Sequence, residues 1–172
     1  MSQKHLKVTI IGDARIGKTL LVKNKFDPDT MRFINGDDIY HIHLFCTEGQ
    51  EEYERLRPLA YEDTQIFLGV WATHESQQNL ENKWIPEVKS HCPGAFVVKA
   101  NLVEFDRDWF NESPVKLAKA VLMADNCEDV TIEKAGDLTN VYETVLKFYI
   151  DKQEKRNLED GEAQGDEKRQ KV

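Results

Sequence analysis

At 172 residues, the chain suits one domain with a buried core, because domains of roughly 100–200 residues fold alone. Its 23 basic and 31 acidic residues give a formal net charge of -8 without a basic cluster, which argues against binding to nucleic acid. Three widely spaced cysteines form no C-x-x-C pair, so we expect no disulfide framework. The sequence has no signal peptide core and no apolar run of about 20 residues that would span a membrane. These features predict a cytoplasmic protein.

The first predicted elements are a strand and a helix that flank a glycine-containing loop. The run LKVTIIG is rich in β-branched residues and ends in glycine, which indicates a strand. The following KTLLVKNKF is compatible with a helix. A loop in this position is the structural context that a phosphate-binding motif requires.

The loop matches the pattern G-x-x-x-x-G-K-[ST] at Gly12, Gly17, Lys18 and Thr19. In this motif, backbone N–H groups surround the phosphates, the lysine neutralises them and the threonine hydroxyl ligates Mg²⁺. The alternative is a glycine turn beside an exposed lysine. The predicted nucleotide-binding residues of this segment are Gly12, Asp13, Ala14, Arg15, Ile16, Gly17, Lys18, Thr19 and Leu20.

The later elements predict a sheet covered by helices. Asn35 and Gly36 stand between two strand-like runs, the pattern of a tight hairpin. The apolar runs TQIFLGVWAT, GAFVVKANLV and EDVTI alternate with helix-like stretches, which is typical of a parallel sheet.

The C-terminal third predicts two helices and a tail. Ser113 and Pro114 fit the N-cap and first position of a helix over VKLAKAVLMA, and Asp137 fits the cap of a helix over LTNVYETVLKFYI. The segment 152–172 is almost entirely charged and polar, so we expect a folded domain over 1–151 and a disordered tail.

Two strings closely resemble the second switch, fourth strand and third helix of Rho-family small GTPases: EGQEEYERLRPLAYEDTQIFLGVWAT and NLENKWIPEVKSHCP. With the phosphate loop, NKF at 24–26 and DRD at 106–108, the resemblance covers most of residues 6–150. It implies a Ras-like α/β fold: a six-stranded, mostly parallel sheet with one antiparallel edge strand, helices on both faces, and nucleotide at the carboxyl edge. It also implies GTP or GDP with Mg²⁺ as ligands and Rho-type regulators or effectors as partners. We expect a monomer.

The resemblance assigns further roles by position. Gly49 is similar to the glycine that senses the terminal phosphate, and Gln50 is similar to the glutamine that orients the attacking water. Phe26 resembles the aromatic residue that packs against guanine. Trp71 and Trp84 fall at family positions within the strand and the helix, which favours packing over a partner-binding pair.

Base recognition is altered relative to the family. The string NLVE stands where the family has N-K-x-D or T-K-x-D, so Asn101 and Glu104 are the candidate guanine ligands. Glu104 carries an extra methylene and Leu102 replaces the lysine, which predicts a weakened guanine preference. Ala135, in EKAGDL, matches a contracted form of the last base-binding loop.

The metal site and first switch also depart from the family. Cys46 replaces the aspartate that holds Mg²⁺ through water, and a neutral thiol is a poor substitute for a hard carboxylate. The segment between Thr19 and Cys46 is shorter than in the family. Thr30 is the candidate for the threonine that closes over the metal, with a turn-forming role as the alternative. We therefore expect weakly held Mg²⁺, with Thr19 as its protein ligand.

Two other features bear on function. His41 and His43 alternate along one strand and share a face, which suits a metal, but no third ligand is evident and a solvated face is favoured. The chain ends without a C-a-a-X box, so no lipid anchor is expected, and the family's insert helix is missing.

Three functional hypotheses follow. The first is a divergent Rho-like protein that binds GTP or GDP and hydrolyses it slowly or not at all. The second is a nucleotide-free pseudo-GTPase scaffold that binds partners through the second switch and third helix. The third is an efficient GTPase switch. The retained Lys18, Thr19 and Gln50 favour nucleotide binding, while Ala14 replaces a family glycine and crowds the place of an activating arginine finger. We expect the first.

Overall fold

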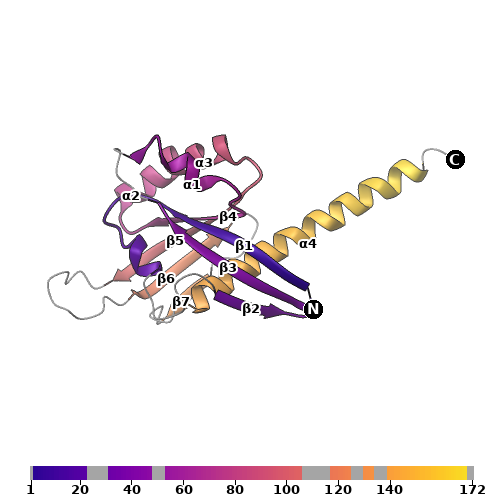
Figure 1. The fold of residues 1–172 in the computed structure, drawn as a ribbon, viewed down its shortest axis with the longest axis horizontal. Helices are drawn as coiled ribbons and strands as arrows, with labels where there is room; N and C mark the ends of the chain where they lie inside the picture. Colours follow the sequence, from indigo (N-terminus) through magenta and orange to yellow (C-terminus); the bar gives the residue numbers. More distant parts are fainter. Residues whose placement is uncertain are drawn as a thin grey trace.

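The protein is seen in a computed structural model, which describes residues 2–22, 31–47, 53–105, 117–124, 130–133 and 139–169. A seven-stranded sheet in the order β2-β3-β1-β4-β5-β6-β7 forms its centre (Figure 1). Its strands are β1 (Ser2–Ile11), β2 (Met31–Asn35), β3 (Asp38–Cys46), β4 (Ile66–Trp71), β5 (Phe96–Phe105), β6 (Leu117–Ala124) and β7 (Val130–Glu133). The helices are η1 (Lys18–Leu21), α1 (Arg57–Tyr61), α2 (His74–Asn79), η3 (Leu80–Trp84), α3 (Ile85–His91) and α4 (Thr139–Arg169).

The two faces of the sheet are buried by different helices. On one face, Leu6, Val8 and Ile10 of β1 pack in a core with the first turns of α4. On the other face, Ile11 joins a second core with α1, η3 and α3. Successive residues of a strand point to opposite faces, so one apolar strand supplies both cores. The helices α1, α2 and α3 lie together on one side of the sheet in Figure 1, while α4 runs along the other and projects beyond it.

The helix α2 begins at a capping box, and the helical segment after it is π-helical up to Trp84, two residues before Pro86. Thr73 caps α2 in a reciprocal capping box with Ser76. The following segment η3 is π-helical and leads directly into α3, whose first turn contains Pro86. Proline has no N–H to donate to the preceding turn, and π-helical turns occur where the regular hydrogen-bond ladder is interrupted.

The predicted Ras-like architecture is confirmed in outline and corrected in detail. Strand β1 pairs in parallel with β3 and β4, and β4 pairs in parallel with β5. The hairpin at Gly36 (φ 59°) joins β2 and β3 in antiparallel fashion, as the sequence predicts. In the part of the chain that the structure describes, however, the sheet has seven strands, and both β2 and β6 run against their neighbours, where six strands and a single antiparallel strand were expected.

The extra strand replaces a predicted helix. VKLAKAVLMA was expected to be helical, but Leu117–Ala124 forms β6 between β5 and β7. Leu122 and Ala124 pack in the α4-side core, whereas Met123 packs against the opposite core, so the segment is used with a strand's two-residue period. Pairing with β5 and burial on both faces override the local helical propensity. The predicted caps Ser113, Pro114 and Asp137 lie outside the described residues.

The helix α4 also extends further than expected. The prediction of a disordered tail from residue 152 differs from the structure, in which α4 continues to Arg169. Glutamate, lysine, glutamine and arginine are strong helix formers, so this segment can propagate a helix that is already nucleated by the packed turns before it. Among the described residues, no helix is both long and apolar enough to cross a membrane.

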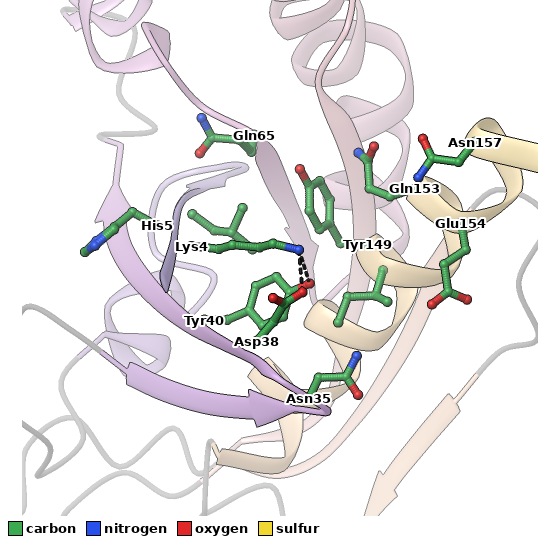
Figure 2. Close-up of a pocket in the computed structure, with 12 residues that line it drawn as sticks. Lys4, His5, Asn35, Asp38, Tyr40, Gln65, Tyr149, Gln153, Glu154 and Asn157 are labelled. Carbon is green, nitrogen blue, oxygen red and sulfur yellow. Dashed lines mark hydrogen bonds and ion pairs between the residues drawn. The ribbon is translucent and has the colours of Figure 1, made fainter. Parts of the chain in front are cut away.

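A hollow of about 570 Å³ lies between the amino end of the sheet and α4 (Figure 2). Lys4 Nζ donates to Asp38 Oδ2 at 2.5 Å and to Tyr40 Oη at 3.4 Å across this hollow. Tyr149 and Gln153 of α4 line the opposite wall. This polar end of the strands lies away from the glycine-containing loop, which follows the carboxyl end of β1.

The strand assignment of 117–124 can be tested through Leu122, which is fully buried. Leu122→Ala is expected to lower the free energy of unfolding by about 2–5 kcal/mol, because it removes buried methyl groups and leaves a cavity. Urea denaturation measures this change. Thr131→Ala, at an exposed position of β7, is the control and should have little effect. Equal and small effects of both substitutions would contradict the core position of β6.

Candidate nucleotide-binding site

The loop between β1 and η1 takes a shape that requires glycine. Gly12 has a φ of 138°, and a Cβ at this position would lie 2.4 Å from the backbone oxygen of Val70 on β4. Gly17, with a φ of 93°, is the left-handed N-cap of η1. The loop therefore turns tightly at the carboxyl edge of the parallel strands, where α/β sheets bind their ligands.

Lys18 is held inside this loop. Its side chain is buried, and its ammonium donates to the backbone oxygen of Gly12 at 2.7 Å and to that of Asp13. A buried ammonium is stable only where such acceptors compensate its lost hydration. The arrangement places the cation of the phosphate motif against the backbone that would surround the phosphates. The alternative of a glycine turn beside an exposed lysine is therefore wrong.

Some residues next to Lys18 anchor the loop in the core, and others are exposed. Ile16 and Leu21 are buried in the α4-side core, whereas Arg15 and Thr19 are exposed. Tyr142 of α4 donates a buried hydrogen bond of 2.7 Å to the backbone oxygen of Leu21. The predicted helix after the loop is described only as the 3₁₀ segment η1, which includes the backbone of Leu20. Thr19 is thus an exposed residue in the first turn of η1.

Asp13 ties the loop to the helical layer, a role that the sequence analysis missed. Its Oδ1 accepts from Trp84 Nε1 at 2.7 Å, and its Oδ2 accepts from Asn79 Nδ2 at 2.8 Å. Both carboxylate oxygens are thereby used to hold the loop against α2 and η3. The packing role expected for Trp71 and Trp84 is confirmed, since both indoles are buried, but Trp84 also carries this polar contact. Only the fold brings position 13 beside position 84.

The contact continues from Trp84 to α1. The guanidinium of Arg57 lies 4.7 Å from the ring centre of Trp84, and Arg57 forms two hydrogen bonds of 3.2 Å to Glu87. Tyr61 Oη donates to Glu87 Oε1 at 2.7 Å. Burial alone would raise the pKa of Glu87, but the hydrogen bonds from Arg57 and Tyr61 and the charge of Arg57 hold that pKa below its usual value. A chain of contacts therefore joins the loop to α1.

Cys46 lies at the same edge of the sheet as the loop. It ends β3, and its register partner on β1 is Ile10. The next residue, Thr47, is buried and donates to the backbone oxygen of Ile10 from its backbone N at 3.1 Å and from Oγ1 at 2.9 Å. The side chain of Cys46 is exposed. The structure thus places a thiol where the resemblance implies a carboxylate near the metal.

Two of the predicted base-binding residues lie near the carboxyl end of β5. Asn101 and Glu104 lie within β5, where Asn101 is paired with Trp71 on one side and Val121 on the other. Leu102 between them is buried in the core. The strand β6 pairs along this segment, at Asn101, Leu102 and Glu104. Five further candidates lie outside the described residues: Phe26, Thr30, Gly49, Gln50 and Ala135.

A comparison with protein-family models decides the affiliation. The model described as the Ras family matches residues 7–154, which run from β1 to the packed part of α4. The chain belongs to the Ras family. It is a small GTP-binding protein, and the predicted Ras-like P-loop fold is confirmed. GTP or GDP with Mg²⁺ is the ligand set of Ras-family proteins, and small GTPases generally interact with regulators and effectors.

The described part of the P-loop fits the phosphates of such a nucleotide. The close approach at Gly12 leaves the loop backbone free of a side chain there, and Lys18 supplies a positive charge beside it. Thr19 offers a hydroxyl to Mg²⁺, whereas Cys46 offers no hard oxygen. The residues of the phosphate motif are therefore compatible with a phosphate group, and position 46 offers no oxygen ligand to a metal.

The contact of Asp13 with Trp84 yields a testable prediction. Trp84→Phe keeps the aromatic packing but leaves Asp13 Oδ1 without its donor, which is expected to cost about 1–3 kcal/mol of stability. Asp13→Ala, which removes the acceptor of Trp84 Nε1, should cost at least as much. In the double variant the two effects should not add, because both substitutions break the same contact. Urea denaturation of the four proteins measures the coupling, and strict additivity would show that the contact contributes nothing.

Proposed function

We propose that this Ras-family protein is a Rho-like cytoplasmic GTP- or GDP-binding protein that hydrolyses GTP slowly or not at all. The observation that carries the proposal is Lys18, which is buried within the loop and hydrogen-bonded to its backbone. A phosphate that enters the loop would meet the ammonium of Lys18, which already lies against the backbone of the loop. Little reorganisation is then needed for binding, which favours affinity.

Slow hydrolysis is supported by two positions. Ala14 stands where the Rho-like pattern has a glycine, and its methyl group occupies space that an arginine finger from an activating protein would need. Such a finger raises the rate by about 10³–10⁵. Cys46, at the edge of the sheet beside β1, removes a carboxylate from the metal environment. Both changes reduce stabilisation of the charge that develops on the transferred phosphoryl group.

Weak base discrimination accompanies this activity. A residue that reads guanine must direct its polar atoms out of the sheet at the nucleotide edge. The backbones of Asn101 and Glu104 are paired with β6, and the buried Leu102 stands between them in place of the family's lysine. We therefore expect GTP and ATP to differ less in affinity than they do for a protein with the family's full base-recognition motif.

A second function, a partner-binding scaffold that works without nucleotide, is favoured by a different observation. Tyr53, Leu56 and Leu59, in and just before α1, are 40%, 58% and 73% exposed. Large apolar side chains grouped on a surface are typical of protein interaction sites. Two hydrogen bonds between Arg57 and Glu87 hold α1 against α3, and neither residue belongs to the P-loop. Regulators or effectors of Rho type are the partners expected for it.

Thermal unfolding with added nucleotide separates the two functions. GDP, GTP and ATP should each raise the melting temperature of the wild type, since a ligand at 100 times its Kd stabilises the folded state by about 2.7 kcal/mol. Lys18→Ala should abolish this shift. Lys99→Ala, which removes an ammonium paired with Glu81 away from the loop, is the matched control and should keep it.

The possible outcomes point to different functions. No shift of the wild type with any nucleotide would refute the proposal and leave the scaffold. A shift that Lys18→Ala retains would mean that the nucleotide binds elsewhere. Near-equal shifts with GTP and ATP would support weak base discrimination.

The altered metal site leads to a second prediction. With Thr19 and the phosphates as its main ligands, Mg²⁺ should be mostly water-coordinated and weakly held. The rate of GDP release should therefore change little when EDTA is added, and Cys46→Asp should make release more sensitive to EDTA. A fluorescent GDP analogue reports the rate. A tenfold acceleration by EDTA in the unmodified protein would show that the metal site is intact.

A further inference from the structure

The strands β1 and β3 bring three imidazoles together on one face of the sheet. The sequence analysis found only His41 and His43, which alternate on β3. The parallel register places His5 of β1 directly opposite His41. Figure 2 shows His5 directed away from Lys4 and Tyr40, which line the hollow on the other side of β1. The third ligand that was missing from the sequence therefore comes from the neighbouring strand.

Two of the imidazole nitrogens already lie at nearly the spacing of metal ligands. His5 Nδ1 and His43 Nε2 are 3.0 Å apart. Two nitrogens that bind one tetrahedral Zn²⁺ at about 2.0–2.1 Å each are separated by roughly 3.3–3.4 Å. An ion could thus take the place of the shared proton after a movement of a few tenths of an ångström and a rotation of both rings that directs the two nitrogens at it. His5 is exposed, so the pair is accessible to an ion from solvent.

The third imidazole has a nitrogen in need of a partner. The ring of His41 stacks on that of His5, with centroids 4.8 Å apart and an interplanar angle of 12°. Within the described part of the chain, His41 Nε2 is the one buried side-chain nitrogen or oxygen atom without a hydrogen bond. A buried nitrogen without a partner is energetically costly, and coordination of an ion would relieve that cost.

Two cationic residues are register partners of the histidines, and one of them is engaged elsewhere. Arg32 of β2 is the register partner of His41, and its side chain is exposed. Lys7 is the register partner of His43, but its ammonium donates to the backbone oxygen of Glu62 at 2.7 Å and lies over the ring of Phe45. The protein as a whole carries a formal charge of -8.

We propose that His5 and His43, joined by His41 after rotation of its ring, bind a divalent transition-metal ion of the Zn²⁺ class. In the described residues, no group of three or more histidine, cysteine or acidic side chains is already arranged around a metal position. The site therefore starts from two preset nitrogens and gains its third on binding. Imidazole ligands select such ions over Mg²⁺, which prefers oxygen. The ion would clamp β1 to β3, the strands that lead to the P-loop and to Cys46.

Calorimetric titration of the nucleotide-free, reduced protein with Zn²⁺ tests this site. The wild type should bind one ion per chain, and His5→Gln and His43→Gln should each weaken binding at least tenfold. His74→Gln changes an exposed histidine of α2 that contacts Gln78, and it should bind as the wild type does. Cys46→Ser should also leave the affinity unchanged. Circular dichroism verifies that each variant is folded.

A measurement on the unmodified chain guards against variants that do not fold. In ¹H–¹⁵N spectra of the histidine side chains, Zn²⁺ should shift the ring signals of His5 and His43 strongly and that of His74 little. Absence of binding heat, loss of binding in Cys46→Ser alone, or equal spectral shifts at all histidines would each overturn the proposal.

Discussion

The carboxylate of Asp13 is the contact on which the arrangement of this protein depends. Its two oxygens bind the indole of Trp84 and the amide of Asn79, so the phosphate-binding loop is fastened to the helical layer rather than to its own strand alone. Hydrogen bonds to a charged acceptor are among the stronger polar contacts in proteins. The loop conformation, the position of η3 and the orientation of Trp84 are therefore linked.

From Trp84 the linkage reaches the surface of α1. Arg57 stacks on the indole and binds Glu87, and Tyr61 binds the same carboxylate. The apolar side chains of Tyr53, Leu56 and Leu59 lie in and beside the helix that this cluster holds. The contacts from Asp13 to Arg57 therefore connect the P-loop with α1 and its exposed apolar side chains.

The sequence predicted the parts of the site that depend on local backbone geometry. Gly12 and Gly17 adopt positive φ angles in a loop between a strand and a short helical segment, and Lys18 lies against that loop. The phosphate-binding motif could therefore be recognised from the spacing of its two glycines, its lysine and its threonine. The partners of Asp13 were not readable, because Asn79 and Trp84 lie more than sixty positions away. The third histidine was missed for the same reason: His5 meets His41 only through strand register.

Where local preference and tertiary pairing disagreed, the pairing prevailed. The segment 117–124 has a helix-compatible composition, yet it became β6 because β5 and β7 satisfy its backbone and both cores receive its side chains. At the end of α4, where few tertiary contacts compete, local helical preference of the charged residues prevailed instead. The sequence by itself thus determined the P-loop, the hairpin and the parallel strands, which follow from short-range backbone preferences and hydrophobic patterns. Only the tertiary structure decided the seventh strand, the anchoring of Asp13 and the histidine cluster, because each depends on register and packing between segments that are distant in the chain.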